Sequence, residues 1–139
     1  MILLDTNVVS ALMSAERERI VVQWLDRQPL FSVWITAVTL MEIRYGLETM
    51  AKGRRQEAMA RSFEALLSEA IEHRVAPFDA EAAQEAAKLM SARKARGRPG
   101  ELKDTMIAGI AQSKGATLAT RNLGHFADLS VPVVNPWEA

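Results

Sequence analysis

The sequence contains no cysteine and only two histidines among its 139 residues. The absence of cysteine excludes thiolate catalysis and cysteine-ligated zinc, and it suits a reducing compartment such as the cytoplasm. A chain of this length can bury a sizeable core without help from a disulfide or a structural metal. We therefore expect one cytoplasmic domain that spans residues 1–139.

Long apolar runs and a net charge are also missing. Asp5 interrupts the apolar start after four residues, whereas a signal peptide needs about 7 to 15 and a membrane helix about 20. Seventeen basic and seventeen acidic side chains cancel, so the chain lacks the overall positive field that holds nucleic acid by charge alone. No membrane partner is expected, and a polyanion must be bound by local patches or through a metal.

Short apolar segments alternate with amphipathic ones along the chain. The spacing predicts strands over residues 1–4, 30–35, 75–78, 116–120 and 131–134. It predicts helices over residues 8–15, 16–28, 36–50, 52–74, 80–96 and 102–114. This alternation is typical of an α/β domain with a mostly parallel central sheet and helices on both faces.

Three acids fall where such a fold keeps its ligand sites. Asp5 ends the first strand, and Glu42 lies in the first turns of the helix after the second strand. The carboxyl ends of parallel strands and the amino ends of the following helices share one sheet edge, so these two acids are expected to be close. Asp104 lies in the first turn of a later helix, on a largely apolar face where acids are unusual. Only the tertiary fold can bring Asp104 to the other two.

Each acid also has a purely structural interpretation. Asp5 can cap the next helix, Glu42 can close a capping box with Thr39, and Asp104 can complement a helix dipole. Taken together, three carboxylates in one partly buried site repel one another unless a hard cation bridges them. Oxygen ligands favour Mg²⁺ or Mn²⁺ over zinc, and such ions activate water and neutralise charge at a phosphodiester.

Four segments carry a family resemblance. They are residues 3–7 (LLDTN), 36–46 (TAVTLMEIRYG), 104–108 (DTMIA) and 118–122 (LATRN). In this order they resemble the signature blocks of PIN-domain proteins, in particular the VapC toxins of bacterial toxin-antitoxin pairs. The closing residues 134–137 (VNPW) are similar to the FitB-like members. The resemblance spans the chain and implies the three-layer PIN-like fold.

The resemblance implies an endoribonuclease that depends on Mg²⁺ or Mn²⁺ and hydrolyses RNA with metal-activated water. The implied catalytic residues and metal ligands are Asp5, Glu42 and Asp104. The implied supporting residues are Thr6, Asn7, Thr120 and Asn122. The family often has a fourth acid at the position of Asn122, and an amide contributes no charge. This departure weakens the case for a second metal, and Asn122 acts indirectly or serves as a turn residue.

The resemblance also implies partners. These are an RNA substrate, a VapB-like antitoxin whose tail occupies the acidic groove, a second copy of the chain in a homodimer, and DNA through the antitoxin only. Trp24 and Trp34 are candidates for a partner surface. Arg44 and Arg121 are candidates for RNA phosphate contacts.

Other charged residues and other functions stay open. The basic run of Arg93, Lys94, Arg96 and Arg98 is either a further phosphate patch or a solvated face. His125 is interpreted as an incidental loop residue. The alternative functions are a PIN nuclease of RNA processing without an antitoxin, and a degenerate PIN module that binds RNA. A phosphatase of the haloacid dehalogenase type is set aside, because it needs a second acid where the sequence has Asn7.

Overall fold

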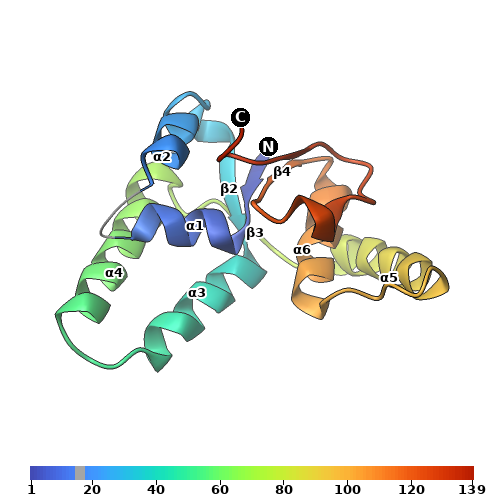
Figure 1. Ribbon diagram of the computed structural model, residues 1–139, viewed down its shortest axis with the longest axis horizontal. Helices are drawn as coiled ribbons and strands as arrows, with labels where there is room; N and C mark the ends of the chain where they lie inside the picture. The colour runs from blue at the N-terminus through green and yellow to red at the C-terminus, as the bar shows by residue number, and fades with distance from the viewer. Residues whose placement is uncertain (15–17) are drawn as a thin grey trace.

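The computed structural model describes residues 1–14 and 18–139, and a five-stranded parallel sheet runs through its centre (Figure 1). The strands are β1 (Ile2–Leu4), β2 (Val33–Thr36), β3 (Val75–Ala76), β4 (Thr117–Ala119) and β5 (Val133–Val134). Their order is β3-β2-β1-β4-β5, and every neighbouring pair is parallel. The predicted parallel α/β architecture is confirmed, with β1 in the middle.

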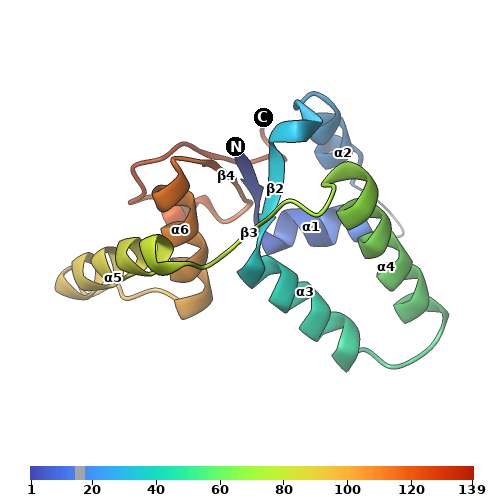
Figure 2. The same cartoon turned by 180° about the vertical axis from the view of Figure 1, so that it is seen from behind.

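Helices cover both faces of this sheet. They are α1 (Thr6–Met13), α2 (Arg19–Asp26), α3 (Ala37–Thr49), α4 (Arg54–Ala65), α5 (Ala80–Ala95) and α6 (Leu102–Lys114). Figures 1 and 2 show α1, α2 and α4 on one side of the sheet and α5 and α6 on the other. None of the helices in the described residues combines the length and the apolar composition of a membrane span.

The two faces of β1 explain why its sequence is uniformly apolar. Successive side chains on a strand point to opposite faces, and Leu4 packs into the core formed with α1, α2 and α4. Leu3 packs into the second core, which α5 and α6 complete. Both leucines are fully buried, as expected for a central parallel strand that is covered on both sides.

Several element boundaries differ from the prediction. The helix predicted over residues 52–74 ends at Ala65 and continues as a π-helical turn, η2 (Leu66–Ala70). Glu72 and His73 then adopt positive φ angles, which stop the helix. The strand predicted from residue 30 begins after a 3₁₀ turn, η1 (Leu30–Ser32).

Trp24, a candidate for a partner surface, is only 5% exposed and packs in the core beside α1, so that interpretation is wrong. The predicted boundary between the helices over residues 8–15 and 16–28 falls at residues 15–17, which lie outside the described residues. The helix after β1 starts two residues earlier than predicted, at Thr6, because Asp5 caps it.

Gly109 allows α5 and α6 to pack closely against each other. A Cβ atom at this position would lie 2.6 Å from the Ala82 carbonyl oxygen and 2.9 Å from the Ala86 Cβ. Gly109→Ala is therefore expected to lower the free energy of unfolding by about 1 to 3 kcal/mol, although alanine favours helices.

Gly46 in α3 provides the matched control for this prediction. A Cβ atom added there has no described atom within 4 Å, so Gly46→Ala is expected to raise the free energy of unfolding by up to about 1 kcal/mol. Urea denaturation measures both variants. A stabilising Gly109→Ala substitution would show that the two helices do not need this close approach.

Candidate active site

The carboxyl ends of β1, β2 and β4 meet at one edge of the sheet. Leu4 is in register with Ile35 of β2 and with Ala119 of β4, so the residues that follow these strands come together. Asp5 follows β1 directly, and its backbone N–H donates to the Ala119 carbonyl over 2.9 Å. Its Oδ1 accepts a 2.8 Å hydrogen bond from the Thr6 backbone N–H. Asp5 therefore caps α1, as its structural interpretation predicts, and also stands at the candidate site.

The Asp5 carboxylate is buried, with 4% of the residue exposed. Its Oδ2 accepts hydrogen bonds from Thr120 Oγ1 over 2.7 Å and from Asn7 Nδ2 over 3.2 Å. Burial raises the pKa of Asp5, and the nearby charges of Asp104 and Glu42 raise it further, against the lowering effect of the Thr120 and Thr6 hydrogen bonds. The edge of the sheet thus concentrates negative charge that a cation would stabilise.

Glu42 reaches the same edge from α3. Thr36, not Thr39, caps this helix, because its Oγ1 accepts a 3.0 Å hydrogen bond from the Thr39 backbone N–H. The capping-box interpretation of Glu42 is therefore wrong, and its Oε1 instead accepts from Thr6 Oγ1 over 2.8 Å. Thr6 connects the two acids, since its backbone N–H binds Asp5 and its hydroxyl binds Glu42.

Asp104 approaches from the first turn of α6. Its Oδ2 lies 2.9 Å from His125 Nδ1 in the 3₁₀ turn η3 (Leu123–Phe126). His125, interpreted from the sequence as an incidental loop residue, thus contacts one of the candidate site acids. Asp104 is also close enough for its charge to raise the pKa of Asp5, so the tertiary fold brings all three acids into one electrostatic neighbourhood.

Lys103 is a site residue that the sequence analysis missed. Its Nζ lies 3.7 Å from Glu42 Oε2, and it precedes Asp104 in the chain. The only sequence signal was a base next to a candidate acid in the first turn of a helix. Two basic side chains thus contact the acids directly. Lys103 contacts Glu42, and His125, which is a cation only when protonated, contacts Asp104.

The donor set suits a hard divalent cation, although the acids do not form a closed cage. Within the described ranges, no three acidic or histidine side chains lie close enough together to enclose a metal ion. Glu42 is instead engaged by Thr6 and Lys103, and Asp104 by His125. The fit is one of chemistry alone, because the candidate ligands are carboxylates and the Asp5 carboxylate is buried, where an uncompensated charge is unfavourable.

The smaller polar residues hold the Asp5 side of the site in place. Asn7 Nδ2 contacts Thr120 Oγ1 over 3.3 Å, and Asn7 Oδ1 accepts from the Arg121 backbone N–H over 3.1 Å. The Asn122 backbone N–H donates to Thr120 Oγ1 over 3.0 Å. Asn122 is thus connected to Asp5 through one intervening hydroxyl.

The two arginines predicted to contact RNA make contacts within the chain. Arg44 forms an ion pair with Glu64, and its guanidinium lies 5.0 Å from the centre of the Phe63 ring. The guanidinium of Arg121 lies over the Trp137 ring at 4.6 Å. Arg44 would have to share or leave its ion pair with Glu64 to bind a phosphate, whereas stacking on Trp137 leaves the in-plane N–H donors of Arg121 available.

Comparisons with known proteins identify the family of the chain. The family model of the PIN domain matches residues 2–131. The VapC ribonuclease Y4jK of Sinorhizobium fredii is 37% identical over 138 residues, 99% of either chain. Toxin FitB of Neisseria gonorrhoeae is 34% identical over 137 residues, again 99% of either chain. A solved structure of FitAB bound to an IR36 DNA fragment superimposes with a TM-score of 0.88 at 34% identity, covering 99% of this chain and 96% of that one. The chain therefore belongs to the PIN domain family.

Proposed function

We propose that this chain is a metal-dependent endoribonuclease and the toxin of a type II toxin-antitoxin pair, acting in the cytoplasm. The observation that supports the proposal is the buried Asp5 carboxylate at the carboxyl edge of the sheet, whose pKa is raised by burial and by the charges of Asp104 and Glu42. Relatives of nearly identical length named VapC ribonuclease and Toxin FitB support the reaction class and the toxin role.

Asp5, Glu42 and Asp104 would hold Mg²⁺ or Mn²⁺. When bound, such an ion lowers the pKa of a water molecule and neutralises charge at the phosphodiester. The chain's own contribution is orientation, because Thr120 and Asn7 fix the Asp5 carboxylate and Thr6 fixes Glu42. Lys103, whose side chain is 45% exposed at the rim of the site, can contact a phosphate oxygen as the strand enters.

Protein partners form the second part of the proposal. Met41 and Tyr45 on α3 are 52% and 69% exposed, and Phe31 is 78% exposed. Large apolar side chains that remain in water suit contacts with a second copy of the chain and with an antitoxin. The FitAB structure contains a bound DNA fragment, and we propose that this chain meets DNA only through its antitoxin.

The experiment is a metal add-back assay with single-stranded and structured RNAs. Chain stripped of metal is expected to leave RNA intact, and Mg²⁺ or Mn²⁺ is expected to start endonucleolytic cleavage that a chelator stops. An Asp5→Asn chain purified in parallel controls for contaminating ribonucleases. Cleavage that proceeds equally in chelator would refute the proposed mechanism.

Asn122 supports one alternative, because an amide stands where the resemblance leads us to expect a fourth acid. On this reading the chain is a PIN module that binds RNA without cleaving it. Such a module would bind RNA in the same assay, release no fragments with either metal, and tolerate Asp5→Asn. Suppression of cleavage by a co-expressed small DNA-binding protein would instead separate a toxin from an RNA-processing nuclease.

A further inference from the structure

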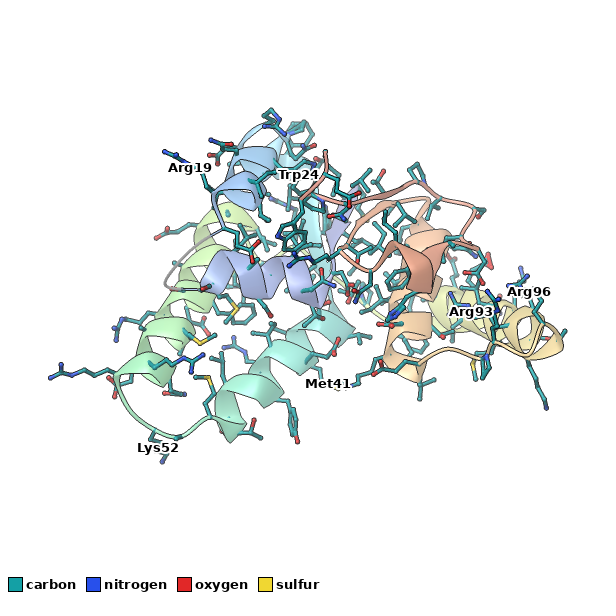
Figure 3. The ribbon with its side chains drawn as sticks, in the orientation of Figure 1. Arg19, Trp24, Met41, Lys52, Arg93 and Arg96 are labelled. Atoms are coloured by element: carbon teal, nitrogen blue, oxygen red, sulfur yellow. The ribbon has the colours of Figure 1, made fainter. Side chains whose placement is uncertain are left out.

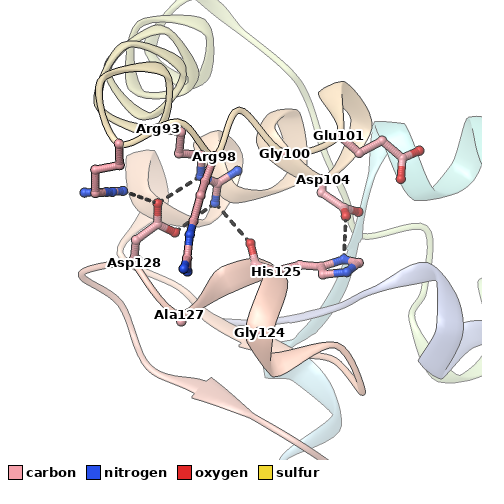
Figure 4. A pocket seen from close by; sticks show the side chains of 10 residues that line it. Arg93, Arg98, Gly100, Glu101, Asp104, Gly124, His125, Ala127 and Asp128 are labelled. Atoms are coloured by element: carbon pink, nitrogen blue, oxygen red, sulfur yellow. Dashed lines mark hydrogen bonds and ion pairs between the residues drawn. The ribbon is translucent and has the colours of Figure 1, made fainter.

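A pocket of about 490 Å³ opens beside Asp104 on the α5 and α6 side of the molecule (Figure 4). It lies between the last turn of α5, the loop that leads to α6, and η3. Arg96 and Arg98 line one part of it, and Asp104 and His125 line another. Its volume is in the range of pockets that hold small ligands, and it shares Asp104 with the candidate active site.

Arg93 forms a fixed wall of this pocket. Although it belongs to the basic run, it is 4% exposed, so the solvated-face interpretation is wrong for this residue. Its Nε and Nη2 each donate to Asp128 over 2.9 Å, and Nη1 donates to Thr105 Oγ1 over 3.0 Å. Nη2 also donates to the His125 carbonyl over 3.1 Å. Arg93 is therefore structural, and its charge is matched by Asp128.

The next two arginines carry the free positive charge of the pocket. Arg96 Nη2 lies 2.9 Å from Asp128 Oδ2, but that carboxylate already binds Arg93 in two places, and the Arg96 side chain is 55% exposed. Arg98 is exposed and lines the pocket, as Figure 4 shows. Among the described residues, no carboxylate forms an ion pair with it. Asp128 is thus shared by the guanidinium groups of Arg93 and Arg96, so these three arginines and one carboxylate leave a net charge of two positive units in this part of the pocket.

The pocket is therefore polarised. Glu101 and Asp104 make one end acidic, and Arg96 and Arg98 make the other end basic. A strand whose phosphodiester reaches the acids would bring a neighbouring phosphate to the basic end. The planar guanidinium fork suits phosphate oxygens, which it binds with two parallel hydrogen bonds.

We propose that this pocket binds a phosphate of the RNA strand next to the one that is cleaved, with Arg98 and Arg96 as its ligands. The inference rests on the proposed function, because it takes the bound strand to be the nuclease substrate. Arg93, Asp128 and Thr105 shape the pocket without touching the strand. Single-stranded RNA fits best, since its backbone can bend into a cavity beside the reacting phosphodiester.

The test measures binding and cleavage separately. Anisotropy of a labelled single-stranded oligoribonucleotide, in chelator and over a range of salt concentrations, reports binding without cleavage. Arg98→Gln is expected to weaken binding about tenfold at low salt and to reduce the slope of log K against log salt by about 0.7, the loss of one phosphate contact. Arg96→Gln is expected to act in the same direction.

Arg55→Gln is the matched control, since Arg55 is exposed on α4. Figure 3 shows Arg93 and Arg96 beside α5, on the opposite side of the molecule from α4. The control should bind like the unaltered chain. In the cleavage assay with Mg²⁺, Arg98→Gln should raise KM about tenfold with little change in kcat, as expected for a contact made equally in the bound and transition states.

The outcomes separate this inference from the proposed function. If the unaltered chain cleaves RNA and Arg98→Gln and Arg96→Gln match Arg55→Gln in both assays, the pocket inference alone is refuted. If the chain cleaves nothing but RNA binding still depends on Arg98, the phosphate site stands and the nuclease proposal fails. Arg98-dependent binding of a glutamate-rich peptide, without any such effect on RNA, would assign the pocket to a protein partner and overturn the inference.

Discussion

Asp5→Asn is expected to abolish RNA cleavage and at the same time to make the metal-free fold more stable. A bound metal supplies several kcal/mol of transition-state stabilisation, so the loss of its most buried ligand should reduce kcat/KM by roughly a thousandfold or more. An asparagine oxygen can still accept the Thr6 backbone N–H that caps α1. The change removes the charge and leaves the cap, but the amide NH2 that replaces Oδ2 cannot accept the hydrogen bonds from Thr120 and Asn7.

The gain in stability follows from the electrostatics of the buried carboxylate. Burial and the charges of Asp104 and Glu42 raise the pKa of Asp5 above its ordinary 3.8. The folded state then binds a proton more tightly than the unfolded state, so stability falls as pH rises from about 3.8 through the raised pKa. At neutral pH the asparagine variant lacks this penalty. We expect the removal of the charge to outweigh the two lost hydrogen bonds, so that the free energy of unfolding is about 1 kcal/mol higher.

Urea denaturation at several pH values, with and without Mg²⁺, measures this second effect. Metal should stabilise the unaltered chain, because it binds only the folded state, and should stabilise the asparagine variant much less. Glu48→Gln, an exposed acid on α3, is the matched control and should change neither activity nor stability. A metal-free Asp5→Asn chain that is clearly less stable would show that the hydrogen bonds to Asp5 outweigh the penalty of its buried charge.

The proximity of Asp5 and Glu42 could be predicted from the sequence, because the position of each acid follows from the strand that precedes it. Each acid follows a buried parallel strand, and the ends of such strands meet at one edge. The position of Asp104 does not follow from a preceding strand. Most of the chain separates α6 from β1, and only the packing of the helices brings Asp104 toward Asp5. The place of Asp104 in the site was expected from the family resemblance and stays a prediction, which the effect of its charge on the pKa of the buried Asp5 supports.

The basic pocket shows where the sequence analysis fell short. Arg93 follows Ala82, Ala86 and Leu89 along the buried face of α5, so helical periodicity did place it in the core. The run of neighbouring bases concealed this signal, and the partner that makes burial possible, Asp128, lies in a loop without a pattern of its own. His125 was misread for the same reason, because the path of η3 is set by contacts with α5 and α6.

Asp128→Ala is expected to destabilise the chain by about 3 to 5 kcal/mol. The substitution leaves the Arg93 guanidinium buried without its counter-charge, and the loss of one partner of a buried pair typically costs this much. Arg93 holds the pKa of Asp128 below its ordinary 3.8, so the stabilisation is present above about pH 3.8 and is lost as pH falls through the lowered value. Acid denaturation of the unaltered chain should show this loss, and the alanine variant should not.

Arg96→Gln is the matched control for this prediction. Arg96 shares the Asp128 carboxylate from the surface, and exposed pairs contribute no more than about 1 kcal/mol. Asp128→Ala should therefore lower the free energy of unfolding several-fold more than Arg96→Gln does. Thermal and urea denaturation of both variants measure the two losses. Equal small effects would mean that water replaces Asp128 around Arg93.

An apolar replacement of the pair separates its contribution to stability from its contribution to the site. Arg93→Met combined with Asp128→Leu removes both charges, and buried pairs replaced in this way often lose little stability. The double variant is therefore expected to recover most of the stability lost in Asp128→Ala.

The double variant cannot restore the hydrogen bonds from Arg93 to Thr105 and to the His125 carbonyl. Thr105 follows Asp104 in the chain, and the His125 side chain contacts Asp104, so these bonds help to position this acid. We expect the double variant to fold but to cleave RNA about 10 to 100 times more slowly, the usual effect of losing groups that orient metal ligands. Full activity in a stable double variant would show that α6 and η3 position Asp104 without Arg93.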